Sequence, residues 1–354
     1  MQNFKKGKPF IFSVGLLLLA VLFCFLIGEI YLTIKENKDH TRLMAKYKNR
    51  DLCVAHSKFP ELIYTFIPNK CGHNSHGYRD HDYSYAKDER VFRIIIIGDS
   101  VAQGQGLKLE ESFGKVLETK LNNLSKSGKY KIEVIVLARS GYSTSQELFL
   151  LENEAFDYSP NLVIWSYVLN DPAHPIYHNA NGELGEYFFK PKLHTVNFLS
   201  KRLFQLNEQI KKKNCEKEFH ALLHCVYKEQ VESNINKISQ IAEKNTIPII
   251  FLIHPIFEKN KDFNTYSLTP LHMRLNDLAS KGGLSVLDLL NAYKFYNPNE
   301  IKQQVSETWY DPWHPNEKGN MIIAESIYTY MNEKKYIKEW LIEIGLDEKM
   351  RVES

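Results

Sequence analysis

Apolar and polar positions alternate in blocks along most of the chain. Five short runs of apolar, mostly β-branched residues are separated by longer stretches with the periodicity of amphipathic helices. Continuous apolar runs are typical of strands buried on both faces, and the stretches between them of helices that cover such a sheet. The runs predicted as strands are 92–98, 131–137, 161–169, 247–254 and 284–289. The stretches predicted as helices are 111–124, 144–157, 227–244, 269–281 and 316–331.

The second predicted helix carries a start signal. Ser143, Thr144 and Ser145 are good capping residues, and Glu147 is placed to complete a capping box. The whole pattern predicts a parallel sheet covered on both faces. Ligands of such sheets bind outside the carboxyl ends of the strands, so the residues that follow each strand are the ones expected to carry chemistry.

The amino terminus has a different pattern. Three lysines are followed by residues 9–28, which carry no charge and are mostly Leu, Phe, Val and Ile. About 20 apolar residues suffice to cross a bilayer as a helix. A cleaved signal peptide usually has a shorter apolar core and small residues at the cut site, and Phe23 before Cys24 does not fit a lipoprotein signal. We predict an uncleaved anchor in residues 1–33, with residues 9–33 in the membrane.

Two features disagree on which side of the membrane the rest of the chain lies. Lysines and arginines after the span outnumber those before it, which by the positive-inside rule places the main domain in the cytoplasm. The cysteines outside the span, however, form two local pairs, Cys53 with Cys71 and Cys215 with Cys225, which suit disulfides in an oxidising compartment. Four unrelated thiols are the alternative. We expect the larger part to be exported, to the periplasm or the cell exterior.

Composition and pattern divide the rest of the chain. The net charge of +3 is spread among nearly equal numbers of cations and acids, unlike the concentrated basic face of a nucleic-acid binder. We predict a main domain over 91–331, preceded by a tether and lead-in segment at 34–90 and followed by a helical tail at 332–354. Residues 172–226 break the rhythm with prolines and an Asn-Ala-Asn-Gly turn, and are predicted to be an insertion or lid.

Polar residues that suit acyl transfer follow three of the predicted strands. Ser100 comes after the first strand, and a serine becomes a good nucleophile only when an oriented base takes its proton. Asp311 and His314, in the proline-bounded loop "DPWHPN", could supply the orienter and the base. Gly141 and Asn170, after the next two strands, could donate hydrogen bonds to a developing oxyanion. Each residue alone has a simpler interpretation in a turn, but together they occupy successive strand ends.

These positions resemble the four sequence blocks of the SGNH hydrolases, also called GDSL esterases and lipases. The blocks are matched by "IIGDS", "SGYST", "VLND" and "DPWHPN", and the resemblance covers roughly residues 91–331. The stretch "PNKCGHNSHGYRD" at 68–80 resembles a lead-in of membrane-linked relatives. The chain departs from the family pattern at Val168, where a glycine is usual, and at Val101, where a leucine is usual. Val168 is expected to change the acyl pocket.

The resemblance implies a role for each polar residue. Ser100 would be the nucleophile, His314 the general base and then acid, and Asp311 its orienter. The N–H groups of Ser100 and Gly141 and the side chain of Asn170 would form the oxyanion hole. Neither a cofactor nor a metal is implied.

Other histidines suggest metal binding at first sight, but their spacing fits no structural zinc site. His254 either lines the site or packs at a strand end, and Trp313 either walls a pocket or anchors its loop. A disulfide would occupy Cys71, so we interpret the other members of its group as solvated loop side chains: His73, His76 and His81. We interpret His220 and His224, four residues apart in a predicted helix, in the same way.

Together these features predict an α/β protein: a three-layer α/β/α flavodoxin-like sandwich with a central parallel sheet of about five strands, plus an N-terminal transmembrane helix. The predicted function is a membrane-anchored serine ester hydrolase that removes acetyl or other short acyl groups from cell-surface glycans or lipids. Its partners would be that acylated substrate and the membrane, with no nucleic acid. The alternatives are an SGNH-type O-acyltransferase that passes the acyl group to a polysaccharide hydroxyl, and a non-catalytic surface-binding module.

Overall fold

The centre of the computed structural model is a sheet of five parallel strands in the order β4-β3-β5-β6-β7. This is the flavodoxin-like order, in which the first strand of the sheet lies between the second and the third. The strands are β3 (Val91–Gly98), β4 (Lys131–Ala138), β5 (Leu162–Val168), β6 (Ile249–His254) and β7 (Ser285–Asp288), as predicted. The structure describes residues 7–47, 53–124, 129–172, 193–258, 262–304 and 310–346.

Burial on both faces explains the unbroken apolar runs of these strands. In β3 every residue after Val91 is buried, and β5 is buried over its whole length. The register then fixes where the chain leaves the sheet: Gly98 lies opposite Ala138 of β4 and Ser166 of β5. The segments that follow these three strands therefore emerge from the same edge of the sheet.

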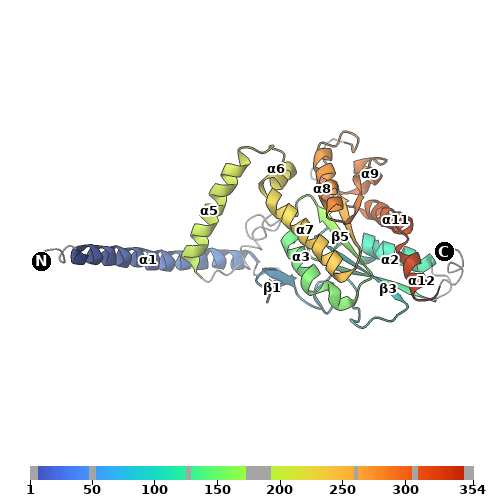
Figure 1. Ribbon diagram of the computed structural model, residues 1–354, viewed down its shortest axis with the longest axis horizontal. Helices are drawn as coiled ribbons and strands as arrows, with labels where there is room; N and C mark the ends of the chain where they lie inside the picture. The colour runs from blue at the N-terminus through green and yellow to red at the C-terminus, as the bar shows by residue number, and fades with distance from the viewer. Residues whose placement is uncertain are drawn as a thin grey trace.

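Helices cover both faces of the sheet, which confirms the predicted α/β sandwich (Figure 1). One pair, α2 and α11, packs together, and a separate row runs from α3 through α7 to α8. Their bounds are α2 (Phe113–Leu124), α3 (Thr144–Asn153), α7 (Lys228–Asn245), α8 (Thr269–Lys281) and α11 (Glu317–Glu333). All five correspond to predicted helices, within a few residues at each end.

Shorter elements complete the domain. The predicted tail contains a helix whose Trp340 packs edge-on against Phe92 and Tyr130, so this helix is part of the domain core. The shorter elements are β1 (Val54–His56), β2 (Tyr64–Phe66), η1 (Leu109–Glu111), η2 (Ala155–Tyr158), α9 (Leu290–Tyr293), α10 (Pro298–Ile301), β8 (Lys302–Gln304), β9 (Tyr310–Pro315) and α12 (Tyr336–Glu343).

Helix α3 begins where predicted but has a different capping box. Ser143 is the N-cap, and its N–H donates to Gln146 Oε1 at 3.0 Å. Glu147 is fully buried and accepts a hydrogen bond from Trp165 Nε1 at 2.7 Å. The assignment of Glu147 to the box was wrong, because the third helical position is residue 146 and residue 147 points into the core.

The amino-terminal helix is longer than the apolar run within it. Helix α1 (Gly7–Tyr47) contains a stretch, Phe12–Lys38, that by length and composition could cross a membrane, with its side chains outside the core. Figure 1 shows it as a straight rod projecting from the domain. The helix continues into the segment predicted as a tether. Within the predicted insertion lie α5 (His194–Lys212) and α6 (Phe219–Val226), while 173–192 fall outside the described residues.

Both predicted cysteine pairs form disulfides in the structure. Cys53 bonds to Cys71, tying the β1–β2 hairpin to the lead-in segment at 68–80. Cys215 bonds to Cys225, tying the segment between α5 and α6 to the end of α6. The fifth cysteine, Cys24 of α1, is free and exposed.

We predict that only one of the five cysteines can be alkylated when the protein is isolated without reductant and then unfolded. The reason is that disulfides persist only in an oxidising compartment. Intact mass after alkylation should show one adduct, five after reduction, and none for unreduced Cys24→Ser. Five adducts without reduction would place the domain in a reducing compartment.

Candidate active site

A serine, a histidine and an aspartate form a continuous chain of hydrogen bonds at the carboxyl edge of the sheet. The Nε2 atom of His314 lies 2.8 Å from Ser100 Oγ, and its Nδ1 atom lies 2.6 Å from Asp311 Oδ2. When Nδ1 carries the proton and donates to Asp311, Nε2 is free to accept from the Ser100 hydroxyl. All three residues are at most 8% exposed. The structure thus brings together side chains separated by more than 200 positions in the sequence.

The Asp311–His314 segment is more regular than the predicted loop. It forms strand β9, paired antiparallel with β8, and leads into α11, where the Asn316 side chain caps the helix by accepting from the Gly319 N–H. Asp311 Oδ1 accepts from the backbone N–H groups of Trp313 and His314, at 2.9 and 3.0 Å. Burial raises the pKa of Asp311, but these bonds and His314 outweigh it, so its pKa is below the usual value.

Ser100 sits in a turn that requires a glycine close behind it. A Cβ atom on Gly98 would lie 2.9 Å from the carbonyl oxygen of Ser166 and 2.8 Å from the Ala102 side chain. After Gly98 the chain turns, and the Asp99 carboxylate accepts from the Val101 N–H at 2.9 Å. The glycine allows β3 and β5 to approach closely, and the turn then presents the Ser100 hydroxyl at the rim.

The two predicted oxyanion donors follow the strands on either side of β3. Gly141 has φ of 79°, a left-handed conformation that favours glycine, and no described residue accepts from its N–H. Asn170 is half-buried, and its Oδ1 atom is buried without a hydrogen-bond partner among the described residues. Gln103 joins the turns beside Ser100 and Gly141, because its Oε1 accepts from the Ser140 N–H at 2.8 Å. The departure at Val168 is a fully buried strand residue.

Comparison with known proteins places this arrangement in a family. The model of the GDSL-like lipase/acylhydrolase family matches residues 94–327. The chain belongs to the GDSL-like lipase/acylhydrolase family. With its Ser100–His314–Asp311 chain, this GDSL hydrolase is a serine esterase. A search of curated proteins gave no match.

Several solved structures are similar to this GDSL hydrolase. One is LAE5, an α/β hydrolase enzyme from the metagenome of Lake Arreo, Spain, with 17% identity, a TM-score of 0.43, and 67% of this chain and 94% of LAE5 covered. Another is the acetylxylan esterase Axe2 from Geobacillus stearothermophilus, with 14% identity, a TM-score of 0.44 and coverage of 68% and 93%. A lipase/acylhydrolase from Enterococcus faecalis has 15% identity, a TM-score of 0.41 and coverage of 69% and 96%. At these similarities none indicates which ester this chain cleaves.

The lead-in segment 68–80 supports the turn that carries Ser100. The Arg79 guanidinium donates to the carbonyl oxygens of Gln103 and Gly104, both at 2.9 Å, and to that of Leu107. These three carbonyls belong to the polar segment immediately after the serine. Arg79 therefore holds in place a loop that has little secondary structure of its own.

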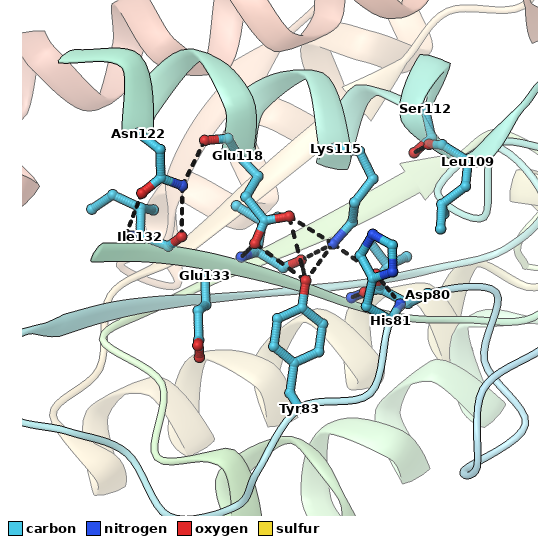
Figure 2. A network of polar contacts seen from close by, with 12 residues as sticks. Asp80, His81, Tyr83, Leu109, Ser112, Lys115, Glu118, Asn122, Ile132 and Glu133 are labelled. Carbon is cyan, nitrogen blue, oxygen red and sulfur yellow. Dashed lines mark hydrogen bonds and ion pairs between the residues drawn. The ribbon is translucent and has the colours of Figure 1, made fainter. Parts of the chain in front are cut away.

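A buried ion pair anchors the lead-in segment to the domain (Figure 2). Lys115 extends from α2 to Asp80, with 2.7 Å between Nζ and Oδ1, and also donates to Tyr83 and Glu118. The other oxygen of the Asp80 carboxylate accepts from the Val136 N–H of β4 at 2.7 Å. The Lys115 side chain is only 5% exposed, and a charge at that depth needs several partners. An amphipathic helix usually exposes its lysines, so the sequence pattern did not reveal this one.

Three further acids are buried close to the carboxyl edge of the sheet, and nothing in the sequence pattern distinguishes them from exposed acids. Asp99 precedes the serine, Glu147 lies on α3 and Asp171 follows Asn170. Burial raises the pKa of each carboxyl group, and the nearby acids add to the rise for Glu147 and Asp171. One oxygen of Glu147 and one of Asp171 have no partner among the described residues.

The carboxyl groups around the site differ in the direction of their pKa shifts. Burial favours the neutral form of the three acids close to the sheet edge, whereas His314 and two N–H groups favour the charged form of Asp311. Such a separation of pKa values commonly assigns different roles to neighbouring carboxyl groups. Asp311 is therefore the carboxylate placed to stabilise a protonated His314.

The structure contradicts the sequence prediction for three histidines and decides between two interpretations of a fourth. His73, His220 and His224 are buried rather than solvated: His73 stacks on a phenylalanine ring, and the other two face the domain from α6. His254 packs beneath the strand end, with Nε2 2.8 Å from Ser166 Oγ. The solvated interpretation was wrong for His73, His220 and His224, because packing buries all three rings. Among the described residues no cluster of His, Cys, Asp or Glu is arranged to hold a metal ion.

Helix α6 contacts two segments of the candidate site, the one that carries His314 and the one before Asn170. Trp313 Nε1, beside His314, donates to His220 Nε2 at 3.3 Å, so Trp313 anchors its segment. His224 Nε2 donates to the Leu169 carbonyl at 3.2 Å, one residue before Asn170. Helix α6 is thus a wall shared by the histidine side and the oxyanion side of the site.

We predict that the burial of neutral His224 lowers the free energy of unfolding in mild acid. Burial, together with nearby cations, lowers the pKa of His224 to about 3, so the unfolded chain binds a proton that the folded chain does not between about pH 6.5 and 3. Stability from this group is complete above about pH 6.5 and decreases as the pH falls. The His224→Gln variant keeps a donor for the Leu169 carbonyl. As the pH falls, its free energy of unfolding should decrease less steeply than that of the wild type, and the two slopes should differ by about 1.4 kcal/mol per pH unit.

The measurement is urea unfolding between about pH 7 and 5. His81→Gln, a change at an exposed histidine, is the matched control and should keep the wild-type slope. Equal slopes for His224→Gln and wild type would contradict a neutral His224 in the folded state.

Proposed function

We propose that this GDSL hydrolase is a membrane-anchored esterase that removes acetyl or other short acyl groups from cell-surface glycans or lipids through an acyl-serine intermediate. The observation that carries the proposal is the continuous chain from Ser100 Oγ through His314 to Asp311, at 2.8 and 2.6 Å. A chain of this kind activates a hydroxyl group that is otherwise a weak nucleophile.

In the first half of the reaction Ser100 Oγ attacks the ester carbonyl while His314 Nε2 takes its proton. Asp311 holds the imidazole in the required tautomer and stabilises the imidazolium. The negative charge on the carbonyl oxygen is met by the N–H groups of Ser100 and Gly141 and by the Asn170 carboxamide. His314 then returns the proton to the departing alcohol, and the acyl group remains on Ser100.

In the second half water takes the place of the alcohol. His314 removes a proton from the water as it attacks the acyl-serine carbonyl, and the same donors hold the oxyanion. The carboxylic acid leaves, and the proton returns to Ser100 Oγ. A sugar hydroxyl could enter in place of water, in which case the protein would be an O-acyltransferase.

The substrate class and the location of the domain rest on separate observations. The exposed apolar surface of α1 supports a membrane anchor, and the two disulfides support an extracytoplasmic domain. A tethered esterase outside the cytoplasm meets acylated surface polysaccharides and the esters of the bilayer itself. The intact triad geometry favours an enzyme over a non-catalytic binding module.

We predict that Ser100→Ala abolishes both labelling by a fluorophosphonate probe and release of acetate from acetyl esters. Without the hydroxyl there is no nucleophile, so kcat/KM should fall by at least about a thousandfold. Labelling of the Ser100→Ala protein would refute the assignment.

Asn170→Ala is the companion variant, because it keeps the nucleophile and removes an oxyanion donor. It should still be labelled, but kcat should fall by about 100- to 1,000-fold with little change in KM. An unchanged kcat would exclude Asn170 from the oxyanion hole.

We predict that the acyl-enzyme reacts with water in preference to added sugars. With an acetyl ester donor and an acceptor glycan, free acetate should account for most of the donor consumed, as measured by chromatography of both products. If most of the acetyl group appears on the glycan, and only when Ser100 is present, the protein is an acyltransferase and the hydrolase proposal fails.

A further inference from the structure

Helix α5 exposes a line of apolar side chains that a helix of a water-soluble domain would bury. The exposed residues recur at intervals of three and four, so they lie on one face of the helix. They are Val196, Leu199, Leu203, Leu206 and Ile210, between 47% and 67% exposed. We call this line the α5 apolar face.

The opposite face of α5 is the one that packs on the protein. Phe204 stacks on Tyr227, and Tyr227 donates through its hydroxyl to Glu208 at 2.7 Å. Both contacts join α5 to α6 and its neighbour α7. With these contacts made, the α5 apolar face points away from the domain. Its exposure therefore follows from how the helix is seated.

The start of α5 is fixed to the end of the apolar run of α1. Both oxygens of Glu29 accept from the first turn of α5: Oε1 from the His194 N–H at 2.8 Å and Oε2 from the Thr195 N–H at 2.7 Å. About two turns further along α1, Glu36 bonds to the His194 ring. Glu29 is the first charged residue after the uncharged segment 9–28. If α1 crosses a membrane, α5 begins beside the last turns of the segment that crosses it.

The direction of α5 also suits the bilayer surface. Figure 1 shows α5 leaving α1 at a steep angle and ending beside α6, so it runs across the axis of α1. A helix that crosses a membrane-spanning rod lies close to the plane of the membrane. Basic residues border the α5 apolar face: Arg202 lies beside it, and Lys211, Lys212 and Lys213 follow at its end.

We propose that α5 lies in the membrane–water interface, with the α5 apolar face among the lipid acyl chains and its cations on anionic headgroups. Amphipathic helices with this division of apolar and basic residues bind bilayer surfaces in this way. The inference rests on the proposed membrane anchor. A second copy of the chain is the other occupant that heptad spacing suits, but the attachment to Glu29 and Glu36 places the face beside lipid first.

Interfacial binding of α5 sets the position of the active site. Helix α5 leads directly into the Cys215–Cys225 loop, which closes α6, and α6 contacts Trp313 and Leu169 on the two sides of the site. The chain α1–α5–α6 therefore holds the catalytic edge at a set distance from the lipid. It predisposes the enzyme to esters presented at or near the membrane surface.

Depth-dependent fluorescence quenching tests the proposal on the full chain. One environment-sensitive dye is attached in detergent to the native Cys24, to Leu203→Cys or to Met273→Cys, the latter two in a Cys24→Ser background. Met273 is the matched control, since it is as exposed as Leu203 (68% and 67%) but lies on α8. The proteins are then placed in phosphatidylcholine–phosphatidylglycerol vesicles that carry nitroxide lipids, with the nitroxide either near the headgroup or deep in the acyl chain.

We predict that the dye at 203 loses fluorescence about twofold to the shallow nitroxide and less to the deep one, because an interfacial helix lies roughly 5–10 Å into the boundary region. The dye at 24 should respond more to the deep nitroxide, and the dye at 273 to neither. Quenching at 24 with none at 203 overturns the interfacial helix and leaves the anchor standing. No quenching at 24 overturns the anchor itself.

The same variant identifies a second copy if that is the occupant. Left unlabelled under oxidising conditions, the Leu203→Cys protein would then form a disulfide-linked dimer. The dye-labelled Leu203→Cys protein would resist quenching by both nitroxides. That result would overturn the lipid proposal in favour of pairing between α5 helices.

Discussion

The hydrogen bonds from Ser100 through His314 to Asp311 depend on a constraint that the whole sheet enforces. The serine follows the end of β3, the histidine lies on β9 more than 200 residues later, and 2.8 Å separates Ser100 Oγ from His314 Nε2. A misplacement of about 1 Å in such a contact removes much of the catalytic advantage. The parallel register, the close approach at Gly98 and the cap of α11 all hold this one contact.

The surroundings of the site contain buried charged groups that a stable fold alone does not require. An Arg79 guanidinium holds the loop after the serine, a buried Lys115–Asp80 pair anchors the segment that carries Arg79, and Glu147 and Asp171 are buried with unpartnered oxygens. Replacing a buried ion pair with apolar residues is often neutral or stabilising. Positioning explains the first two groups, because Arg79 contacts the loop after Ser100 and the Lys115–Asp80 pair anchors the segment that carries Arg79.

Outside the sandwich, three helices form a continuous series of contacts that runs from α1 through α5 to α6. The contacts are short and polar at the α1–α5 joint and aromatic at the α5–α6 joint. The disulfide at Cys215–Cys225 makes α6 a rigid end to this series. The proposed anchor and the active site are thereby connected through one continuous set of contacts, and the α5 apolar face lies between them.

The sequence by itself determined the five strands, the covering helices and the residues at the strand ends, because each depends on local pattern or on residue type at a defined position. It left open whether the cysteines form two pairs, because pairing depends on the distance between segments. Only the tertiary structure decided the roles of Glu147, Lys115 and His224. Nothing near them in the sequence distinguishes a capping glutamate, a surface lysine or a solvated histidine from a buried one. Their burial depends on partners that are distant in the chain, such as Trp165, Asp80 and the Leu169 carbonyl, and such partners are set only when the elements pack.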